Sequence, residues 1–343
     1  MAADITDLHK MDQIRVLFVC HAGMKIGLGH LTRMIAVSQS LKIKGVNDFQ
    51  FLIFGEVINR SDLGGVVCTF ISEEKDISSE LLRFVKIDPP KVIVFDLHPN
   101  YIKRSFESLF SKLAESKFIL VGVDSLFNYA DILDLTWIPS FIKPYVLNSC
   151  APKSLKFGWD TYLIQKRLSK PGWQNGNKVL ILTGGSDYTG LGKILPSKID
   201  NQLSQELEIH WVQGPFATDP NLPVSTRLKW VIHKSVESLD ALIVNCNYAI
   251  TVFGVSFFEL LQYGTPTVVF SPYDGKDDIE LSALEKENVA IVSKNDETAV
   301  KDLMYLMENE KLAVSLSQNA LSRFSVNGAN NLAGEILSIL ENK

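Results

Sequence analysis

The stretch "RVLFVC" at residues 15–20 continues into "HAGMKIGLGHLTRM" at residues 21–34, and this junction decides the fold. The short, continuous apolar run predicts a strand that is covered on both faces, as in a parallel sheet. Three glycines then interrupt the pattern, and residues 31–42 follow with a helical period. The residues on the apolar side of that helix are Leu31, Met34, Ile35, Ser38 and Leu41. Strand, glycine loop and helix in this order predict an α/β fold.

The same alternation fills both halves of the chain. Strands are predicted in the first half at 15–20, 49–54, 65–71, 91–96 and 118–124, with a helix at 101–114. Strands are predicted in the second half at 178–185, 208–214, 228–233, 241–246 and 266–272. Helices are predicted there at 191–206, 256–263, 278–287 and 296–307. Two successive arrays of this kind predict two doubly wound α/β domains.

The domain boundaries follow from the breaks in this pattern. Residues 169–178, "SKPGWQNGNK", have no periodicity and contain proline and glycine, so they are the predicted linker. We expect one Rossmann-like domain at 13–168 and a second at 177–325. A C-terminal helix at 326–343 is expected to pack back on the first domain. A length of 343 residues agrees with two domains of about 150 residues each.

Composition excludes several classes of protein. Apolar residues make up 46% of the chain, enough for large cores, so global disorder is excluded. The net charge is −5 and no basic stripe occurs, which argues against a nucleic acid as the main partner. No apolar run approaches the ~20 residues of a membrane span, although contact with a membrane surface stays open.

The cysteines and the first residues predict a cytoplasmic protein. Four cysteines are scattered without a CxxC pair, which is typical of reduced thiols; they are Cys20, Cys68, Cys150 and Cys246. The first dozen residues are polar and acidic, so no secretory signal is expected there. The sequence does not indicate an oligomeric state.

His30 is the first candidate for catalysis. It follows Gly27 and Gly29 at the start of a predicted helix, where glycines let the backbone approach a ligand and the helix end favours an anion. An imidazole at the carboxyl end of a parallel sheet can act as a general base, and Arg33 lies one helical turn later. The alternative is a histidine at a helix start with no chemistry. The spacing is not that of a GxGxxG dinucleotide site, which disfavours a nicotinamide cofactor.

A second candidate site follows the strand that ends at residue 96. The run "VFDLHPNY" at 94–101 brings Asp96, His98 and Tyr101 to the carboxyl end of that strand. If the sheet is parallel, these side chains face the same crevice as His30. Asp96 could orient His30 or bind a sugar hydroxyl. The alternative is that Asp96 caps the helix after Pro99.

Two glycine-containing turns in the second half predict a phosphate site. The run Gly184, Gly185, Ser186 and Asp187 follows a strand, and a helix comes next. Its small residues would let a phosphate or the other domain approach. The other interpretation, a plain turn in which Asp187 or Thr189 caps the helix, is compatible with that contact. The second turn, Gly254-Val255-Ser256 after Phe253, opens a helix that Gly264 ends. A helix start after glycine suits a diphosphate.

Glu259 lies one turn inside that second helix. A carboxylate at this place can accept hydrogen bonds from both hydroxyls of a ribose. The alternative is that Glu259 complements the helix dipole, worth about 0.3–1 kcal/mol. No HExxH motif and no cluster of histidine, cysteine and acids has metal spacing, so neither a metal nor another cofactor is expected. No G-x-S-x-G motif supports an acyl-transfer triad.

Taken in order, these motifs resemble a known family. "KIGLGHLTRMIAVSQSL" resembles the N-terminal signature of the PseG enzymes and their SpsG-like relatives, a Gly-x-Gly-His-x-x-Arg run. "KFGWDTYLIQKRL" at 156–168 is similar to that family's inter-domain stretch of glycine, tyrosine and a basic-acidic helix. "TGGSD" and the helix with Glu259 resemble its nucleotide-binding turns. The likeness spans about residues 14–295.

The resemblance implies a fold and an activity. The fold is GT-B, two Rossmann-like domains facing a central cleft, as in MurG-like glycosyltransferases. PseG enzymes release UDP from a diacetamido-trideoxy sugar on the way to pseudaminic acid, with water attacking the anomeric carbon. The histidine of the Gly-His turn is the base, a role that falls on His30. Tyr162 and Tyr101 would contact the sugar, and uridine and diphosphate would lie near Gly185, residues 254–256 and Glu259.

Two departures from the family pattern keep other functions open. His98 stands where the family carries a tyrosine, and "TVFGVSFFELL" replaces a serine-rich run before the nucleotide helix. The first alternative is a UDP-sugar glycosyltransferase, in which an acceptor hydroxyl replaces water. The second is a sugar-nucleotide-binding protein without turnover.

Overall fold

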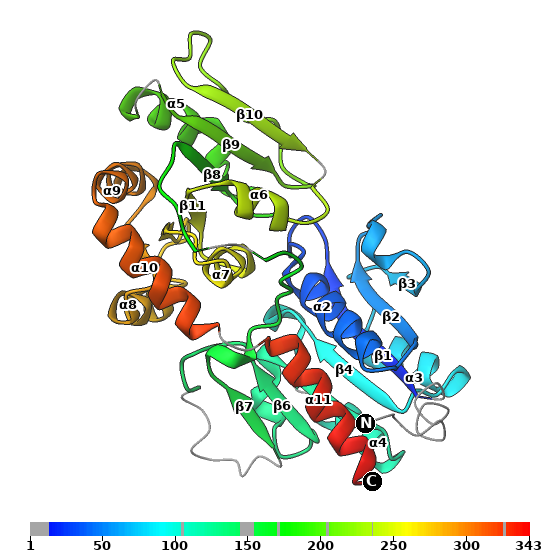
Figure 1. Ribbon diagram of the computed structural model, residues 1–343. Coiled ribbons are helices and arrows are strands. Elements are labelled where there is room, and N and C mark those ends of the chain that lie inside the picture. The colour runs from blue at the N-terminus through cyan, green and yellow to red at the C-terminus, as the bar shows by residue number, and fades with distance from the viewer. Residues whose placement is uncertain are drawn as a thin grey trace. The chain divides into compact units, whose positions relative to one another are not determined.

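The computed structural model describes residues 14–103, 106–144, 154–169, 172–203, 206–234, 236–324 and 327–343. The chain divides into two compact units (Figure 1). The first unit comprises Met1–Ile164 and Val326–Lys343, and the second comprises Gln165–Ser325. Cys150 lies outside the described residues, and Cys20, Cys68 and Cys246 are free thiols.

The first unit is built on a seven-stranded parallel sheet in the order β3-β2-β1-β4-β5-β6-β7. Its strands are β1 (Arg15–Ala22), β2 (Asp48–Gly55), β3 (Val67–Ile71), β4 (Val92–Asp96), β5 (Ile119–Val123), β6 (Leu135–Ile138) and β7 (Leu155–Phe157). Its α-helices are α2 (Gly29–Ile43), α3 (Ile77–Ile87), α4 (Phe106–Glu115) and α11 (Gly328–Glu341). Its short 3₁₀ helices are η1 (Ser61–Leu63), η2 (Pro99–Tyr101), η3 (Asp124–Tyr129) and η5 (Trp159–Thr161).

Helices cover both faces of this first sheet. Alternate residues of β1 enter different cores: Val16 and Phe18 pack with α2 and α11, while Leu17 and Val19 pack with α3 and α4. This is why the strand is apolar along its whole length. Helix α11, drawn in red in Figure 1, lies beside α2 and closes the first core with Ala329, Leu332, Ala333 and Ile336.

The second unit repeats the plan with a six-stranded parallel sheet in the order β10-β9-β8-β11-β12-β13. Its strands are β8 (Lys178–Leu182), β9 (Glu208–Gln213), β10 (Lys229–Lys234), β11 (Tyr248–Val252), β12 (Thr267–Phe270) and β13 (Ile291–Val292). Its helices are α5 (Leu191–Gln202), α6 (Asp240–Asn245), α7 (Val255–Gln262), α8 (Asp278–Glu287), α9 (Asp296–Glu308) and α10 (Glu310–Arg323).

Both sheets have a topological switch point. In each unit the first and fourth strands in chain order lie side by side, β1 beside β4 and β8 beside β11. The connections that leave such a pair run to opposite halves of the sheet, so a crevice forms at the carboxyl ends of the two strands. The loops after these four strands are therefore the expected ligand sites.

Residues 241–246 do not form the predicted strand. Residues 241–245 lie in α6, Cys246 is the C-cap of that helix, and the strand is β11, which begins at Tyr248. The apolar run is short, and its burial follows one face: Ile243 is buried, whereas Ala241 and Asn245 are exposed. A run of this length fits both a strand and a buried helix turn, and the exposure of the alternate positions distinguishes the two.

The stretch between the units also differs from its prediction. Residues 156–168 form the end of β7 and η5 and then continue without the basic-acidic helix that the resemblance implied. The division falls at Ile164 and Gln165, before the predicted linker. Within the second unit, Arg167 N–H donates to Asp240 Oδ1 at 3.1 Å and Leu168 N–H donates to the Tyr263 hydroxyl at 3.1 Å. These bonds fasten the segment to α6 and α7.

Candidate functional site

The switch point of the first unit brings His30 and Asp96 together. Asp96 is the last residue of β4 and lies in register with Cys20 of β1. After β1 the chain turns back at Gly23 and Gly27, which pair as an isolated antiparallel bridge, and α2 then starts at Gly29. Gly27 has a φ of 82°, a conformation that favours glycine. This turn places His30 in the first turn of α2.

His30 and Asp96 form a short hydrogen bond. His30 Nδ1 lies 2.7 Å from Asp96 Oδ1, and both side chains are buried, Asp96 completely. Burial on its own raises the pKa of the Asp96 carboxyl, but Arg33 and His30 outweigh it and hold that pKa at about 2. Asp96 is therefore an anion at neutral pH.

Arg33 holds the Asp96 carboxylate from the other side. Its Nε donates to Asp96 Oδ2 at 2.7 Å, and an Nη donates to Asp96 Oδ1 at 2.8 Å. The same Nη lies 3.0 Å from Asp124 Oδ2. Burial disfavours the charged guanidinium, but Asp96 and Asp124 outweigh it, and the pKa of Arg33 lies above its ordinary value. The Asp96 carboxylate can be buried here because Arg33 neutralises its charge through bidentate hydrogen bonds.

These contacts assign the tautomer of His30. An ionised Asp96 can only accept hydrogen bonds, so His30 Nδ1 must carry the proton of the 2.7 Å bond. The Nη of Arg33, 3.0 Å from the same nitrogen, is a donor as well and directs its protons to Asp96 and Asp124. His30 Nε2 is then the basic nitrogen. An anionic carboxylate on the far side of an imidazole is the arrangement that stabilises an imidazolium during proton transfer.

His98 and Tyr101 lie beside this dyad. The His98 ring meets the His30 ring edge-on, with centroids 5.8 Å apart, and the Tyr101 ring lies 5.9 Å from His98. The Tyr101 hydroxyl donates to Glu73 Oε2 at 3.2 Å. His98 also caps η2, where its Nδ1 accepts from Asn100 N–H at 3.3 Å. Among the described residues, the structure thus groups His30, Arg33, Asp96, His98 and Tyr101.

Three further residues of this cluster were not predicted from the sequence. Asp124 follows β5, the neighbour of β4, and pairs with Arg33. Glu73 follows β3 and binds Tyr101, and His21, near the end of β1, accepts from His98 N–H at 3.1 Å. All three lie at or just beyond the carboxyl ends of strands. Their position relative to the strands was the signal that could have identified them.

Tyr162, predicted to contact the sugar, lies in the segment after η5. It is buried, its hydroxyl accepts from Phe141 N–H at 3.4 Å, and its ring lies 5.8 Å from the Trp159 ring. Its backbone is close to α11, because a Cβ on Gly328 would come within 2.5 Å of the Tyr162 carbonyl oxygen. These contacts are those of a packing residue within the first unit.

In the second unit, Asp187 in the turn after β8 bonds to the start of the next helix. Asp187, with a φ of 45°, accepts from the N–H groups of Leu191 at 2.9 Å and Gly192 at 2.7 Å, the first two residues of α5. Asp187 therefore caps α5, the alternative weighed for it from the sequence. Gly184 has a φ of 89° and is exposed, and Gly185 accepts from Phe216 N–H at 3.0 Å through its carbonyl. Ser186 is half-buried beside them.

Helix α7, after β11, begins differently. Gly254 is its N-cap, and no side chain caps the helix. The first N–H groups, those of Val255 and Ser256, belong to a helix end whose partial positive charge favours an anion. Glu259 lies one turn further and is half-buried. Phe253 donates its N–H to the Phe270 carbonyl at 2.9 Å, and its ring packs against Phe257 and Phe258.

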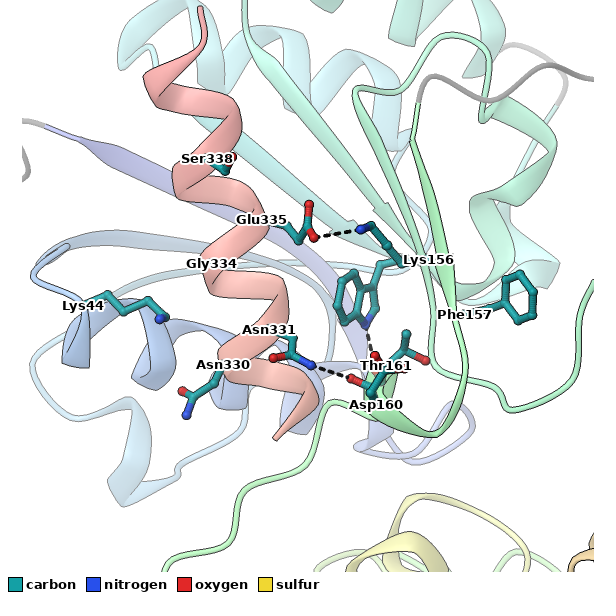
Figure 2. A pocket seen from close by; sticks show the side chains of 11 residues that line it. Lys44, Lys156, Phe157, Asp160, Thr161, Asn330, Asn331, Gly334, Glu335 and Ser338 are labelled. Atoms are coloured by element: carbon teal, nitrogen blue, oxygen red, sulfur yellow. Dashed lines mark hydrogen bonds and ion pairs between the residues drawn. The ribbon is translucent and has the colours of Figure 1, made fainter. Parts of the chain in front are cut away.

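A separate cavity of about 380 Å³ lies in the first unit between α11 and the β7–η5 segment (Figure 2). Trp137 is among the residues that line it, and Figure 2 shows Lys156 and Glu335, an ion pair at 2.8 Å, on one side. None of the predicted site residues lines this cavity. In the described part of the chain, no group of three or more histidine, cysteine or acidic residues is arranged to hold a metal ion. No helix within those same residues is both long and apolar enough to cross a membrane.

No protein-family model matches the chain. An uncharacterized protein of Methanocaldococcus jannaschii, MJ1062, is 25% identical over 275 residues, which are 75% of this chain and 55% of that protein. The chain thus spans about half the length of this curated relative.

Comparison with solved structures gives the fold. MurG of Acinetobacter baumannii matches with a TM-score of 0.63 and 13% identity, over 94% of this chain and 99% of that chain. MnaA of S. aureus, solved with UDP, matches with a TM-score of 0.64 and 10% identity, over 96% and 97%. Spinosyn rhamnosyltransferase SpnG, complexed with thymidine diphosphate, matches with a TM-score of 0.56 and 15% identity, over 96% and 100%. The prediction of two Rossmann-like domains is confirmed: the chain has the GT-B fold.

Proposed function

We propose that this protein is an enzyme that releases UDP from a UDP-linked sugar by directing water at the anomeric carbon. The observation that carries the proposal is the His30–Asp96–Arg33 arrangement at the first switch point. It supplies an imidazole whose Nδ1 donates to a buried anion, so that Nε2 faces away from the carboxylate. The likeness to GT-B proteins, two of them solved with nucleoside diphosphates, supports a nucleotide-sugar substrate.

In the proposed step, His30 Nε2 takes a proton from water as the water oxygen bonds to the anomeric carbon. The bond from that carbon to the diphosphate oxygen breaks, and UDP leaves with the electron pair. The Asp96 carboxylate stabilises the imidazolium that forms, as the aspartate of a serine-protease triad does for its histidine. General base catalysis of this kind contributes about 10²–10⁴-fold to the rate.

In this proposal the second unit binds the nucleotide. The start of α7 at Val255 and Ser256 would receive the diphosphate, where the helix dipole and the N–H groups stabilise the leaving group. Glu259 would bind the ribose hydroxyls. The step needs no metal ion or other cofactor, so EDTA is expected to leave turnover unchanged. We place the reaction in the cytoplasm, within the synthesis of a surface polysaccharide or nonulosonic acid.

The test is incubation with UDP-sugars in ¹⁸O-labelled water, followed by mass spectrometry of the released sugar. A UDP-linked diacetamido-trideoxy sugar is the first substrate to use, because of the PseG-like motifs, and CMP- and GDP-sugars serve as controls. We expect each released sugar to carry one ¹⁸O at the anomeric carbon, and one molecule of free UDP to appear for each molecule of sugar released. Release of no nucleotide from any of these compounds would contradict the proposal.

A glycosyltransferase is the second candidate. It is favoured by MurG and SpnG, structural neighbours of which SpnG is named as a rhamnosyltransferase. His30 would then deprotonate an acceptor hydroxyl instead of water. Turnover that depends on an added acceptor, with no ¹⁸O in the product, would select this reaction over hydrolysis. UDP binding without turnover in either assay would select a binding protein.

A further inference from the structure

His21 is a buried histidine to which the proposed reaction gives no role. It is the seventh residue of β1, is completely buried, and comes one residue after the partner of Asp96 in the sheet register. Its ring lies 4.6 Å from the Tyr101 ring and 6.0 Å from the Phe54 ring. Because it is polar and sealed from solvent, its hydrogen bonds determine what it can do.

His21 is an acceptor in this structure. Its Nδ1 lies 3.1 Å from the backbone nitrogen of His98, which can only donate. Nδ1 is therefore unprotonated, and the neutral ring carries its proton on Nε2. That Nε2 is buried and has no hydrogen-bond partner among the described residues.

The surroundings keep the His21 ring neutral. Burial lowers its pKa to about 3, and the nearby rings of His30 and His98 act in the same direction, while Asp96 opposes them. Neutrality matters for the contact with His98, because a protonated imidazole has two donor nitrogens and cannot accept from an N–H group. A charged His21 would lose this bond.

The accepted N–H group belongs to the loop that carries His98 and Tyr101. Within that loop, Tyr101 N–H donates to the His98 carbonyl at 3.0 Å and Ile102 N–H donates to the Pro99 carbonyl at 3.1 Å. These bonds fix the shape of the loop, while the bond from His98 N–H to His21 ties it to β1. The His21 ring also packs against the Tyr101 ring, with an angle of 35° between the two ring planes.

We propose that His21 is a positioning residue: through its bond to His98 N–H and its contact with Tyr101, it holds the loop after β4 against His30. The role in turnover rests on the proposed function, whereas the role in the loop does not. His21 acts on the reacting atoms through the loop, since no part of its side chain reaches the surface.

The first experiment measures the His21 ring itself and needs no substrate. Two-bond ¹H–¹⁵N correlation spectra of the ¹⁵N-histidine-labelled protein, assigned with the His21→Asn variant, distinguish ring tautomers. From pH 5 to pH 8, His21 is expected to remain neutral with its proton on Nε2. A ring that carries its proton on Nδ1, or that titrates within this range, would overturn the proposal.

The second experiment compares His21→Leu with His21→Asn. Leucine fills the space but cannot accept a hydrogen bond, whereas asparagine offers an oxygen near the position of Nδ1. Hydrogen exchange at the His98 amide is expected to be about fivefold faster in His21→Leu and close to wild type in His21→Asn, from a bond worth about 1 kcal/mol. Equal exchange in the two variants and the wild type would overturn the proposal.

Turnover provides the last readout. If a UDP-sugar is turned over, kcat is expected to fall about tenfold in His21→Leu and to recover in His21→Asn, with unchanged UDP affinity. His233→Leu, a half-buried histidine of the second unit, is the matched control and is expected to keep the wild-type kcat. Equal kcat in His21→Leu and wild type, or equal losses in the leucine and asparagine variants, would refute a positioning role. Absence of turnover in wild type would instead refute the proposed function and leave the spectra and the exchange rates as the test.

Discussion

The two switch points of this molecule occupy equivalent places in the same topology but are built from different chemistry. At β1 and β4, charged and titratable side chains fill the site, and Asp96 and Arg33 neutralise each other in a buried position. At β8 and β11, glycine turns and the start of α7 predominate, and α7, like α2 in the first unit, has no side-chain cap. In the proposed function, side chains of the first switch point move the proton and the start of α7 receives the diphosphate. The fold is duplicated, and the two switch points differ in the side chains that their loops supply.

The largest expected effect is on turnover, from His30→Ala. Removing the base is expected to lower kcat by about 10²–10⁴-fold, because His30 is the group that accepts the proton of water in the proposed step. UDP affinity, measured by calorimetry, is expected to be unchanged, since the nucleotide is assigned to the second unit. A loss of UDP affinity in His30→Ala would contradict the proposal that the first switch point supplies the base and the second binds the nucleotide.

Arg33→Met is expected to have the largest effect on stability. It leaves the buried Asp96 carboxylate without its main partner, and loss of one member of a buried ion pair costs about 3–5 kcal/mol. Urea unfolding measures this loss. The matched control is Arg167→Met in the second unit, because Asp240 keeps its bonds to Ser238, Tyr263 and the Arg167 backbone. Equal costs for the two variants would contradict the special position of Arg33.

Acid lability is expected to distinguish His21 from the other histidines. Its folded-state pKa is about 3 against an ordinary value of 6.5, so between these values the unfolded chain binds a proton that the folded chain does not. The free energy of unfolding therefore falls as pH is lowered through this window, by about 5 kcal/mol over the whole window for this group. His21→Asn removes the titration, and urea midpoints at pH 7 and pH 4.5 are expected to differ less in the variant. An equal difference in wild type and variant would be the contrary result.

Glu259→Ala tests the second switch point. Loss of a carboxylate that binds ribose hydroxyls is expected to weaken UDP binding about tenfold, in keeping with about 1.5 kcal/mol for a hydrogen bond to a charged group. Calorimetry with UDP and with inorganic diphosphate gives the test, and the effect is expected with UDP alone. Glu285→Ala, exposed on α8, is the control. If Glu259→Ala changed the affinities for UDP and for inorganic diphosphate equally, Glu259 would act at the diphosphate and the assignment to the ribose would be wrong.

The smallest effect is expected from Asp187→Ala. The loss of its two bonds to the start of α5 is expected to lower the free energy of unfolding by about 1 kcal/mol, as for other helix caps. UDP affinity is expected to stay at the wild-type value, because the Asp187 carboxylate is engaged with α5. If Asp187→Ala changed UDP affinity tenfold and left the free energy of unfolding unchanged, the diphosphate would bind at the turn before α5 and not at the start of α7.

Much of the architecture could be predicted from the residues because β1, β4, β5 and β8 are buried on both faces and therefore read as continuous apolar runs. Short elements were harder to predict. The run at 241–246 has too few residues to show a period, and β13 has only two residues. The helix expected near residues 162–168 is absent because backbone and side-chain groups there bond to Asp240 and Tyr263, which lie far along the chain.

The residues alone predicted where the chemistry would gather: after parallel strands, at Asp96 and at the glycine turns that precede His30 and the start of α7. Only the tertiary structure decided how those groups are joined. It linked His30 Nδ1 to Asp96, placed Arg33 between Asp96 and Asp124, and buried His21 under the loop of His98. Local sequence sets strand and helix because these depend on neighbouring residues. The protonation states depend on burial and on charges that the sheet brings together from residues 30, 96 and 124.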